Sequence, residues 1–156
     1  KMIEAMMIKQ KPNIKAFHED NGQDLLLKGE VDVVLEYNGD IAQAMVEDED
    51  IGFVIPKEGS QLWFDLLVIP NKSKNKDGAY QLLNYMLKPE VAAANTNFLQ
   101  YANPILTSTP YIEPKLLGDP GLYPPKSVLK RLAVQPPMAA NVEAELKRIW
   151  SKLSKE

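Results

Sequence analysis

Val31-Asp32-Val33-Val34-Leu35 is followed, after one residue, by Tyr37-Asn38-Gly39-Asp40 and then by the helical pattern of Ile41–Val46. The first stretch is apolar and β-branched, which predicts a buried strand. The second has the composition of a turn, so strand, turn and helix follow one another within a short length of chain. In an open α/β sheet, ligands bind at the loop after a strand's carboxyl end. This stretch therefore predicts an α/β fold with a ligand site near residues 37–40.

The rest of the chain extends this pattern. Further strands are predicted at Ile51–Ile55 and Leu62–Ile69, and helices at Lys76–Leu87, Glu90–Phe98 and Asn141–Leu153. Asn75 is expected to cap the first of these helices. Eight of the 12 prolines lie from Pro104 onward, which predicts loops and short helices there. The expected architecture is α/β, with a mixed sheet and flanking helices.

Composition narrows the class of protein. At 156 residues, of which 45% are hydrophobic and 25% charged, the chain has the make-up of an ordinary globular domain. No apolar run approaches the roughly 20 residues that span a bilayer. Lys1-Met2-Ile3-Glu4 opens directly into a helical pattern without a signal peptide, so we expect a chain cut from something longer.

Several kinds of chemistry are excluded or disfavoured. The absence of cysteine rules out disulfides, thiolate chemistry and cysteine zinc sites, and His18 is the single histidine. A multi-histidine metal site or a Ser-His-Asp relay is therefore very hard to assemble. The net charge of −3 argues against nucleic acid and for a cationic partner. We expect no cofactor, no metal and no catalytic residue.

The acidic residues are concentrated. Between Gly29 and Pro56 there are eight acids and no Lys or Arg. For Glu47–Asp50 the plain interpretation is a solvated acidic surface. The alternative is a negative field that concentrates cations near a binding cleft, an interpretation that Asp40 favours.

The order and spacing of eight short motifs give the chain a specific likeness. These motifs are Gly29-Glu30-Val31-Asp32, Tyr37-Asn38-Gly39-Asp40, Phe53-Val54-Ile55-Pro56-Lys57-Glu58-Gly59, Trp63-Phe64-Asp65, Asn75-Lys76, Lys88-Pro89-Glu90-Val91-Ala92, Tyr101-Ala102-Asn103-Pro104 and Leu122-Tyr123-Pro124. With them the chain resembles the spermidine/putrescine-binding proteins of bacterial ABC importers, from about Ile3 to its C-terminus.

The resemblance implies the two-lobed, type II periplasmic-binding-protein fold, with ligand held between the lobes. Family members are roughly twice as long, so the chain resembles the C-terminal half and would contribute to both lobes. Residues 1–63 and 112–156 would belong to the second lobe and residues 64–111 to the first. Its expected partners are a polyamine, an ABC permease in the membrane, and either the missing N-terminal half or a second copy with exchanged segments.

A polyamine needs a particular kind of site. Each buried ammonium requires a carboxylate or carbonyl partner, and aromatic rings suit both the methylenes and the charge. Aromatic residue and carboxylate occur together twice, as Tyr37-x-x-Asp40 and Trp63-x-Asp65. Within a strand, Trp63 and Asp65 would share one face. The alternative for this pair is a core tryptophan beside an incidental acid.

The resemblance assigns these residues their roles. Trp63 would stack on the ligand and Asp65 would pair with an amine, as would Asp40, which matches an acid of the putrescine-preferring branch. Tyr37 stands where the family usually has tryptophan, which leaves a smaller stacking surface. For Asp40 the alternative is a helix N-cap.

Three further positions match ligand-contacting positions of the family. Tyr101 matches a loop tyrosine, Gln135 a glutamine that binds an amine, and Glu19 a position that usually holds serine. The alternatives are a loop aromatic packed on its lobe, an exposed polar residue and a solvent-facing acid, respectively.

Two other functions fit some of these residues. The same fold could bind another small cation or an amino compound. Asp40 and Asp65 could instead form the acid/base pair of a glycoside hydrolase, although no nucleophile or oxyanion motif accompanies them. The expected location is extracytoplasmic, either periplasmic or at the cell surface, with lipid anchoring or fusion to a permease left open.

Overall fold

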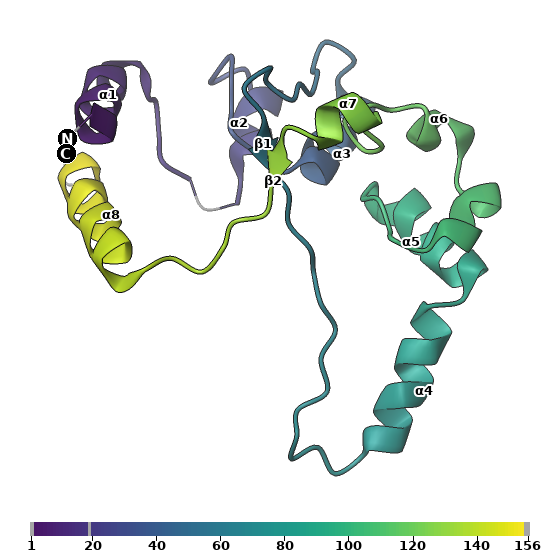
Figure 1. Ribbon diagram of the computed structural model, residues 1–156. Helices are drawn as coiled ribbons and strands as arrows, with labels where there is room; N and C mark the ends of the chain where they lie inside the picture. Colours follow the sequence, from purple (N-terminus) through teal and green to yellow (C-terminus); the bar gives the residue numbers. More distant parts are fainter. Residues whose placement is uncertain (1, 19, 155–156) are drawn as a thin grey trace. The chain divides into compact units, whose positions relative to one another are not determined.

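The computed structural model describes residues 2–18 and 20–154. The chain forms two compact units, of which one is Glu36–Val134 and the other combines Lys1–Leu35 with Gln135–Glu156 (Figure 1).

The central unit, Glu36–Val134, contains helices joined around a small parallel sheet. Its elements are α3 Asn38–Glu47, β1 Ser60–Gln61, α4 Lys76–Met86, α5 Pro89–Leu99, η2 Leu106–Tyr111, α6 Pro114–Leu117, α7 Lys126–Leu129 and β2 Leu132–Ala133. In the sheet Ser60 pairs with Leu132 and Gln61 with Ala133, and Leu62 N donates to the carbonyl of Ala133 at 2.9 Å.

The core of this unit is a cluster of small and branched side chains. Its buried members are Ala42 of α3, Ala93 of α5, Leu116 of α6, and Ile112 and Leu122 from the connecting segments. Gln43 Nε2 also donates to the carbonyl of Leu99 at 3.0 Å, which links α3 to the end of α5. The cluster therefore holds together the helices that precede and follow the candidate site.

The helices confirm the local sequence signals. Asn75 caps α4, because its side chain accepts a hydrogen bond from Gly78 N at 3.0 Å. Pro89 lies in the first turn of α5, where its missing N–H costs nothing. The boundaries of α4, α5 and α8 (Ala140–Leu153) lie within one residue of those predicted.

The three predicted strands do not form, and here the sequence prediction is wrong. Residues 31–35, 51–55 and 62–69 contain no strand, and the sheet that the structure describes is a two-stranded parallel pair rather than a mixed sheet. Leu35, Val54 and Leu66 are 94%, 80% and 79% exposed. A strand needs neighbours to satisfy its backbone groups. Among the described residues of these stretches, Leu62 alone bonds to the sheet, through its N–H to the carbonyl of Ala133.

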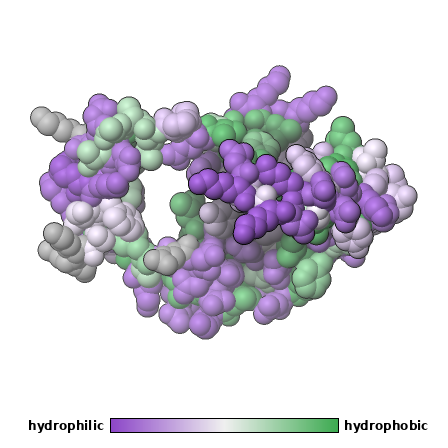
Figure 2. Space-filling model, turned by 90° about the horizontal axis from the view of Figure 1, so that it is seen from below, coloured by the Kyte–Doolittle hydropathy of each residue, from purple (hydrophilic) through white to green (hydrophobic). Residues whose placement is uncertain are grey.

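Exposed apolar side chains are consequently numerous. Figure 2 shows hydrophobic residues, in green, at the surface beside hydrophilic ones. Within residues 62–69 alone, Phe64, Leu67 and Val68 are 63%, 66% and 78% exposed. Among the described residues, no helix is both long enough and apolar enough to cross a bilayer.

The other unit joins the two ends of the chain. It contains α1 Met2–Gln10, η1 Lys11–Asn13, α2 Gly22–Leu27 and α8, with α1 lying beside α8 (Figure 1). Pro12 lies within η1, which follows α1 directly. Gly29, with φ of 65°, ends α2 as expected of a residue that must adopt the left-handed conformation.

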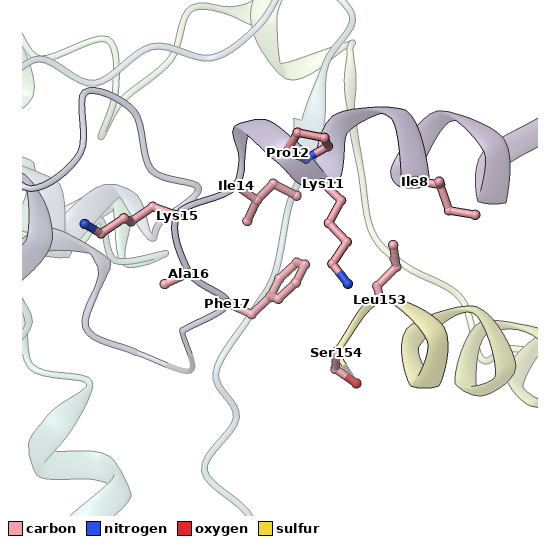
Figure 3. A pocket seen from close by; sticks show the side chains of 9 residues that line it. All are labelled: Ile8, Lys11, Pro12, Ile14, Lys15, Ala16, Phe17, Leu153 and Ser154. Atoms are coloured by element: carbon pink, nitrogen blue, oxygen red, sulfur yellow. The ribbon is translucent and has the colours of Figure 1, made fainter. Parts of the chain in front are cut away.

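A mainly apolar groove lies in this unit beside α1, η1 and the end of α8 (Figure 3). It has a volume of about 500 Å³ and is lined by Ile8, Lys11, Pro12, Ile14, Lys15, Ala16, Phe17, Leu153 and Ser154. Next to it the rings of Phe17 and Trp150 meet edge to face at 4.9 Å. Among the residues that the structure describes, no acidic side chain lines the groove, so it is a poor candidate for a cation site.

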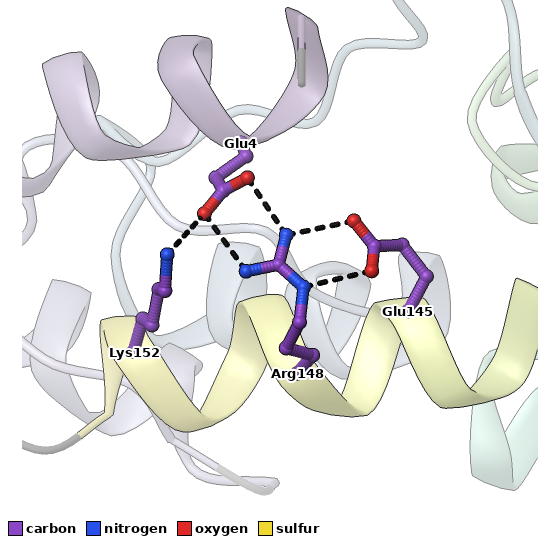
Figure 4. A network of polar contacts seen from close by, with 4 residues as sticks. All are labelled: Glu4, Glu145, Arg148 and Lys152. Carbon is purple, nitrogen blue, oxygen red and sulfur yellow. Dashed lines mark hydrogen bonds and ion pairs between the residues drawn. The ribbon is translucent and has the colours of Figure 1, made fainter.

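An ion network connects α1 to α8 (Figure 4). The carboxylate of Glu4 accepts hydrogen bonds from Arg148 Nη2 at 2.7 Å and from Lys152 Nζ at 2.6 Å. Arg148 also donates to Glu145 through Nε and Nη2, both at 2.7 Å. These bonds from Arg148 and Lys152 lower the pKa of Glu4 to about 2.

The first prediction concerns acid stability. Because the pKa of Glu4 falls from 4.5 to about 2 on folding, its stabilising contribution is complete above pH 4.5 and is lost as the pH falls toward 2. Glu4→Gln should therefore lower the melting temperature of the complete protein at neutral pH, and the difference from wild type should vanish toward pH 2. Thermal melts followed by circular dichroism across this range measure it.

Glu58→Gln is the matched control, since that side chain is 72% exposed and lies 4.0 Å from Lys57. It should leave the melting temperature unchanged. A difference between Glu4→Gln and wild type that stays constant with pH would contradict the assignment of the effect to this carboxylate.

Candidate ligand-binding site

Three aromatic rings from distant parts of the sequence meet in the central unit. The ring centroids of Tyr37 and Trp63 are 5.2 Å apart with planes at 76°, and those of Trp63 and Tyr101 are 5.8 Å apart at 69°. Such edge-to-face contacts contribute about 0.5–1.5 kcal/mol each beyond burial. Trp63 therefore lies between two tyrosines, and the three rings form a cluster that we call the aromatic cluster.

Each ring is positioned by a different local feature. Tyr37 is the N-cap residue of α3 and has an extended backbone. Trp63 comes two residues after β1. Tyr101 follows Gln100, whose left-handed conformation (φ of 58°) ends α5 and turns the chain. The site is therefore assembled from two helix ends and the end of a strand.

Two carboxylates adjoin this cluster. Asp40, in the first turn of α3, lies close to the side chain of Tyr101. Burial, and next the neighbouring Asp40, raise the pKa of Tyr101 well above its usual range. A carboxylate oxygen of Glu36 lies within 4.8 Å of one of Asp40. The edge of the cluster next to Tyr101 thus carries two nearby negative charges.

Asp40 is not the N-cap of α3, which removes the structural alternative for this residue. Tyr37 is the N-cap, and it makes no side-chain capping bond. Asp40 lies further into the first turn, where the helix dipole favours negative charge. Its carboxylate faces Tyr101 instead of satisfying the helix end.

Asp65 is placed differently from Asp40. It is exposed and lies in the segment after β1 that does not form a strand. Among the described residues, no hydrogen bond or ion pair to Asp65 is formed. The argument that Trp63 and Asp65 share a strand face therefore has no support in the structure, and the ligand role of Asp65 stays a prediction.

Nothing in the described structure tests the two remaining predicted residues, Gln135 and Glu19. Gln135 belongs to the unit formed by the chain ends and is exposed. Glu19 lies outside the described residues. Ligand contact by either one stays a prediction.

Glu36 is the residue that sequence reasoning missed. It is half-buried, its Oε1 accepts a hydrogen bond from Tyr37 N at 2.9 Å, and it faces Asp40. In the sequence it appeared only as one member of the acidic run. The available signal was its position directly before Tyr37, but nothing local showed that it would lie beside Asp40.

A buried hydrogen-bond network supports the loop that carries Tyr101. Asn103 Nδ2 donates to Thr96 Oγ1 at 2.8 Å, and Asn103 Oδ1 accepts from Ile105 N at 2.8 Å and Ser108 Oγ at 3.1 Å. Thr96 and Ser108 are only 2% and 1% exposed. Because every partner is satisfied, the network ties the loop firmly to α5 and η2.

The chemistry available to this site is cation binding. Aromatic faces attract cations, and the carboxylates of Asp40 and Glu36 supply opposite charge. The cluster offers no thiol, imidazole or serine hydroxyl that could act as a nucleophile or its base.

Comparison with known proteins shows which family and which individual proteins this chain is similar to. The family model of bacterial extracellular solute-binding protein matches residues 4–117. The chain is 32% identical to the putrescine-binding periplasmic protein SpuD of Pseudomonas aeruginosa, over 98% of this chain and 43% of that protein. It is 33% identical to the putrescine-binding periplasmic protein PotF of Escherichia coli, over 95% of this chain and 42% of that protein.

A solved structure has the same fold. The crystal structure of the spermidine/putrescine ABC transporter substrate-binding protein PotD from Streptococcus pneumoniae superposes with a TM-score of 0.85 at 29% identity. The match covers 96% of this chain and 46% of that one. The chain thus has the fold of part of a periplasmic-type binding protein, and it spans less than half the length of the relatives it matches.

The second prediction concerns the loop network. Replacing Asn103 with Ala takes the bond to Asn103 away from Thr96 Oγ1 and Ile105 N, at a cost of about 1–3 kcal/mol for each group left without a partner, whereas Ser108 Oγ still donates to the carbonyl of Ile105. We expect Asn103→Ala to lower the free energy of unfolding of the complete protein by at least about 2 kcal/mol. Chemical denaturation followed by circular dichroism measures this.

Asn71→Ala is the control, because Asn71 is exposed in a turn and forms none of these bonds. It should change the free energy of unfolding by less than about 0.5 kcal/mol. Equal effects of the two substitutions would show that the network does not stabilise the loop.

Proposed function

This chain belongs to the bacterial extracellular solute-binding protein family, and we propose that it forms part of the substrate-binding component of a polyamine ABC importer. The observation that carries the proposal is the aromatic cluster of Tyr37, Trp63 and Tyr101 with Asp40 at its edge. The role is binding and delivery, with no chemical step.

The physical case rests on what a polyamine requires. Its methylenes need flat apolar walls, which the rings provide, and its ammonium groups need partners when water is removed. Asp40 and Glu36 lie within 4.8 Å of each other, so an ammonium between them relieves the repulsion of two like charges. An anion such as phosphate would meet only repulsion there. Asp65, Gln135 and Glu19 are proposed as further ligand contacts.

The proposed binding cycle involves the whole protein, of which this chain is less than half the length of its relatives. Residues 1–63 and 112–156 are assigned to one lobe and residues 64–111 to the other. Ligand bridging the lobes would favour a closed form, which then docks on a membrane permease. The location follows from the family as extracytoplasmic, with lipid anchoring or permease fusion as further possibilities.

A partner for the unpaired stretches is part of the proposal. Residues 62–69 have the composition of a buried strand, yet Leu66 and Val68 are 79% and 78% exposed. Either the remainder of the protein or a second copy with exchanged segments would cover them. Light scattering that shows a stable, folded monomer of this chain would contradict this part.

The third prediction tests the ligand. Calorimetry on the complete protein should show binding of putrescine, and Asp40→Asn and Asp65→Asn should each weaken it by at least about tenfold, because each removes the charge partner of a buried ammonium. Unchanged affinity in both variants would show that these carboxylates do not contact the ligand.

Asp50→Asn separates a specific site from a general negative field. Asp50 is exposed among the acids Glu47–Asp50, where its backbone N–H donates to Asp48 Oδ1, and it is not a member of the aromatic cluster. It should change the affinity by less than about twofold, and that effect should disappear at high salt. Thermal shift measured with spermidine, with diamines other than putrescine and with amino acids tests the alternative ligands. Turnover of a glycoside would support the hydrolase alternative.

A further inference from the structure

Gly39 lies at the contact between α3 and the aromatic cluster. It is buried in the first turn of α3, between Asn38 and Asp40. A Cβ atom placed on Gly39 would overlap three carbons of the Tyr101 ring, namely Cδ2, Cε2 and Cζ. The ring therefore rests directly on the backbone of the helix.

Conformation does not explain this glycine. Gly39 has helical backbone geometry, which any residue adopts, whereas Gly29 and Gly59 have positive φ. Within a helix, glycine is less favourable than alanine because its backbone loses more freedom on folding. Glycine at this position thus makes the helix less stable than alanine would, and it leaves open the space that the Tyr101 ring occupies.

The ring has little freedom to move elsewhere. Asn103, two residues further on, anchors the loop through Thr96 and Ser108. Trp63 contacts the same ring at a centroid distance of 5.8 Å. A side chain at residue 39 would push the ring away from α3 and so separate its hydroxyl from Asp40.

We propose that Gly39 is a positioning residue of the ligand site: its missing side chain lets Tyr101 lie on α3 between Trp63 and Asp40, and so fixes the position of the ring in the aromatic cluster. The claim about ligand rests on the proposed polyamine function, whereas the claim about packing stands on geometry alone. The raised pKa of the Tyr101 phenol, which follows from its burial and the neighbouring Asp40, provides a ligand-independent probe of the ring's position.

The test is a double-mutant cycle in the complete protein, with Gly39→Ala, Tyr101→Ala and the two combined. With Tyr101 present, Gly39→Ala should lower the melting temperature because the methyl group and ring overlap. In the Tyr101→Ala background the same change should raise the melting temperature, because alanine favours the helix once the space is open. This reversal of sign is decisive even if the single variant folds poorly.

Two further measurements report on the site itself, namely the ionisation of the Tyr101 phenol and the affinity for putrescine. In Gly39→Ala, ultraviolet titration against a Tyr101→Phe reference should show the phenol ionising at lower pH, since it is less buried and farther from Asp40. Binding of putrescine by calorimetry should weaken by at least about tenfold. Gly52→Ala is the control, because a Cβ there meets nothing within 4 Å, and it should leave both values unchanged.

The outcomes separate the two proposals. Additive effects on melting temperature, or an unmoved phenol titration, would overturn the role of Gly39 whatever the ligand. If the sign reversal appears but Gly39→Ala binds putrescine as wild type does, Gly39 is a packing residue and its role in the site is overturned. If wild type binds no putrescine while the reversal appears, the polyamine function fails and the placement of Tyr101 stands.

Discussion

The contact that the candidate site depends on is the shared core of α3, α5 and α6. Ala42 and Ala93 lie in one buried cluster with Leu116, and Gln43 binds the carbonyl of Leu99 at the end of α5. Because α3 carries Asp40 and α5 leads into Tyr101, this core fixes the carboxylate against the ring. Trp63 then completes the cluster from the end of β1.

Two nearby carboxylates, those of Glu36 and Asp40, determine the electrostatics of the site. Carboxylate oxygens of Glu36 and Asp40 lie within 4.8 Å of each other, and two like charges at this distance repel. In the proposed function, a cationic ligand would offset this repulsion. Tyr101 links the two halves of the site, since its ring contacts Trp63 and its side chain lies close to Asp40.

The exposed apolar stretches illustrate a second constraint, which is that a strand needs neighbouring segments. A strand buried on both faces is stable only if neighbours supply hydrogen bonds and apolar surface. Within residues 62–69, Leu62 bonds to Ala133 and Trp63 packs on two tyrosines, but Leu66 is 79% exposed. Relatives more than twice as long share the fold of this chain. Local signals thus suffice for the helices, whereas a strand over residues 62–69 would need a neighbouring segment.

The sequence by itself determined the elements whose signals are local. The Asn75 cap, Pro89 and the periodicity of α4, α5 and α8 placed those helices to within a residue, because helical hydrogen bonds join residues four apart. Only the tertiary structure decided that the predicted strands do not form, that the ring of Trp63 meets those of Tyr37 and Tyr101, that Glu36 lies near Asp40, and that Gly39 makes room for a ring. Each of these depends on segments far apart in sequence, whose approach is set by packing and by available partners.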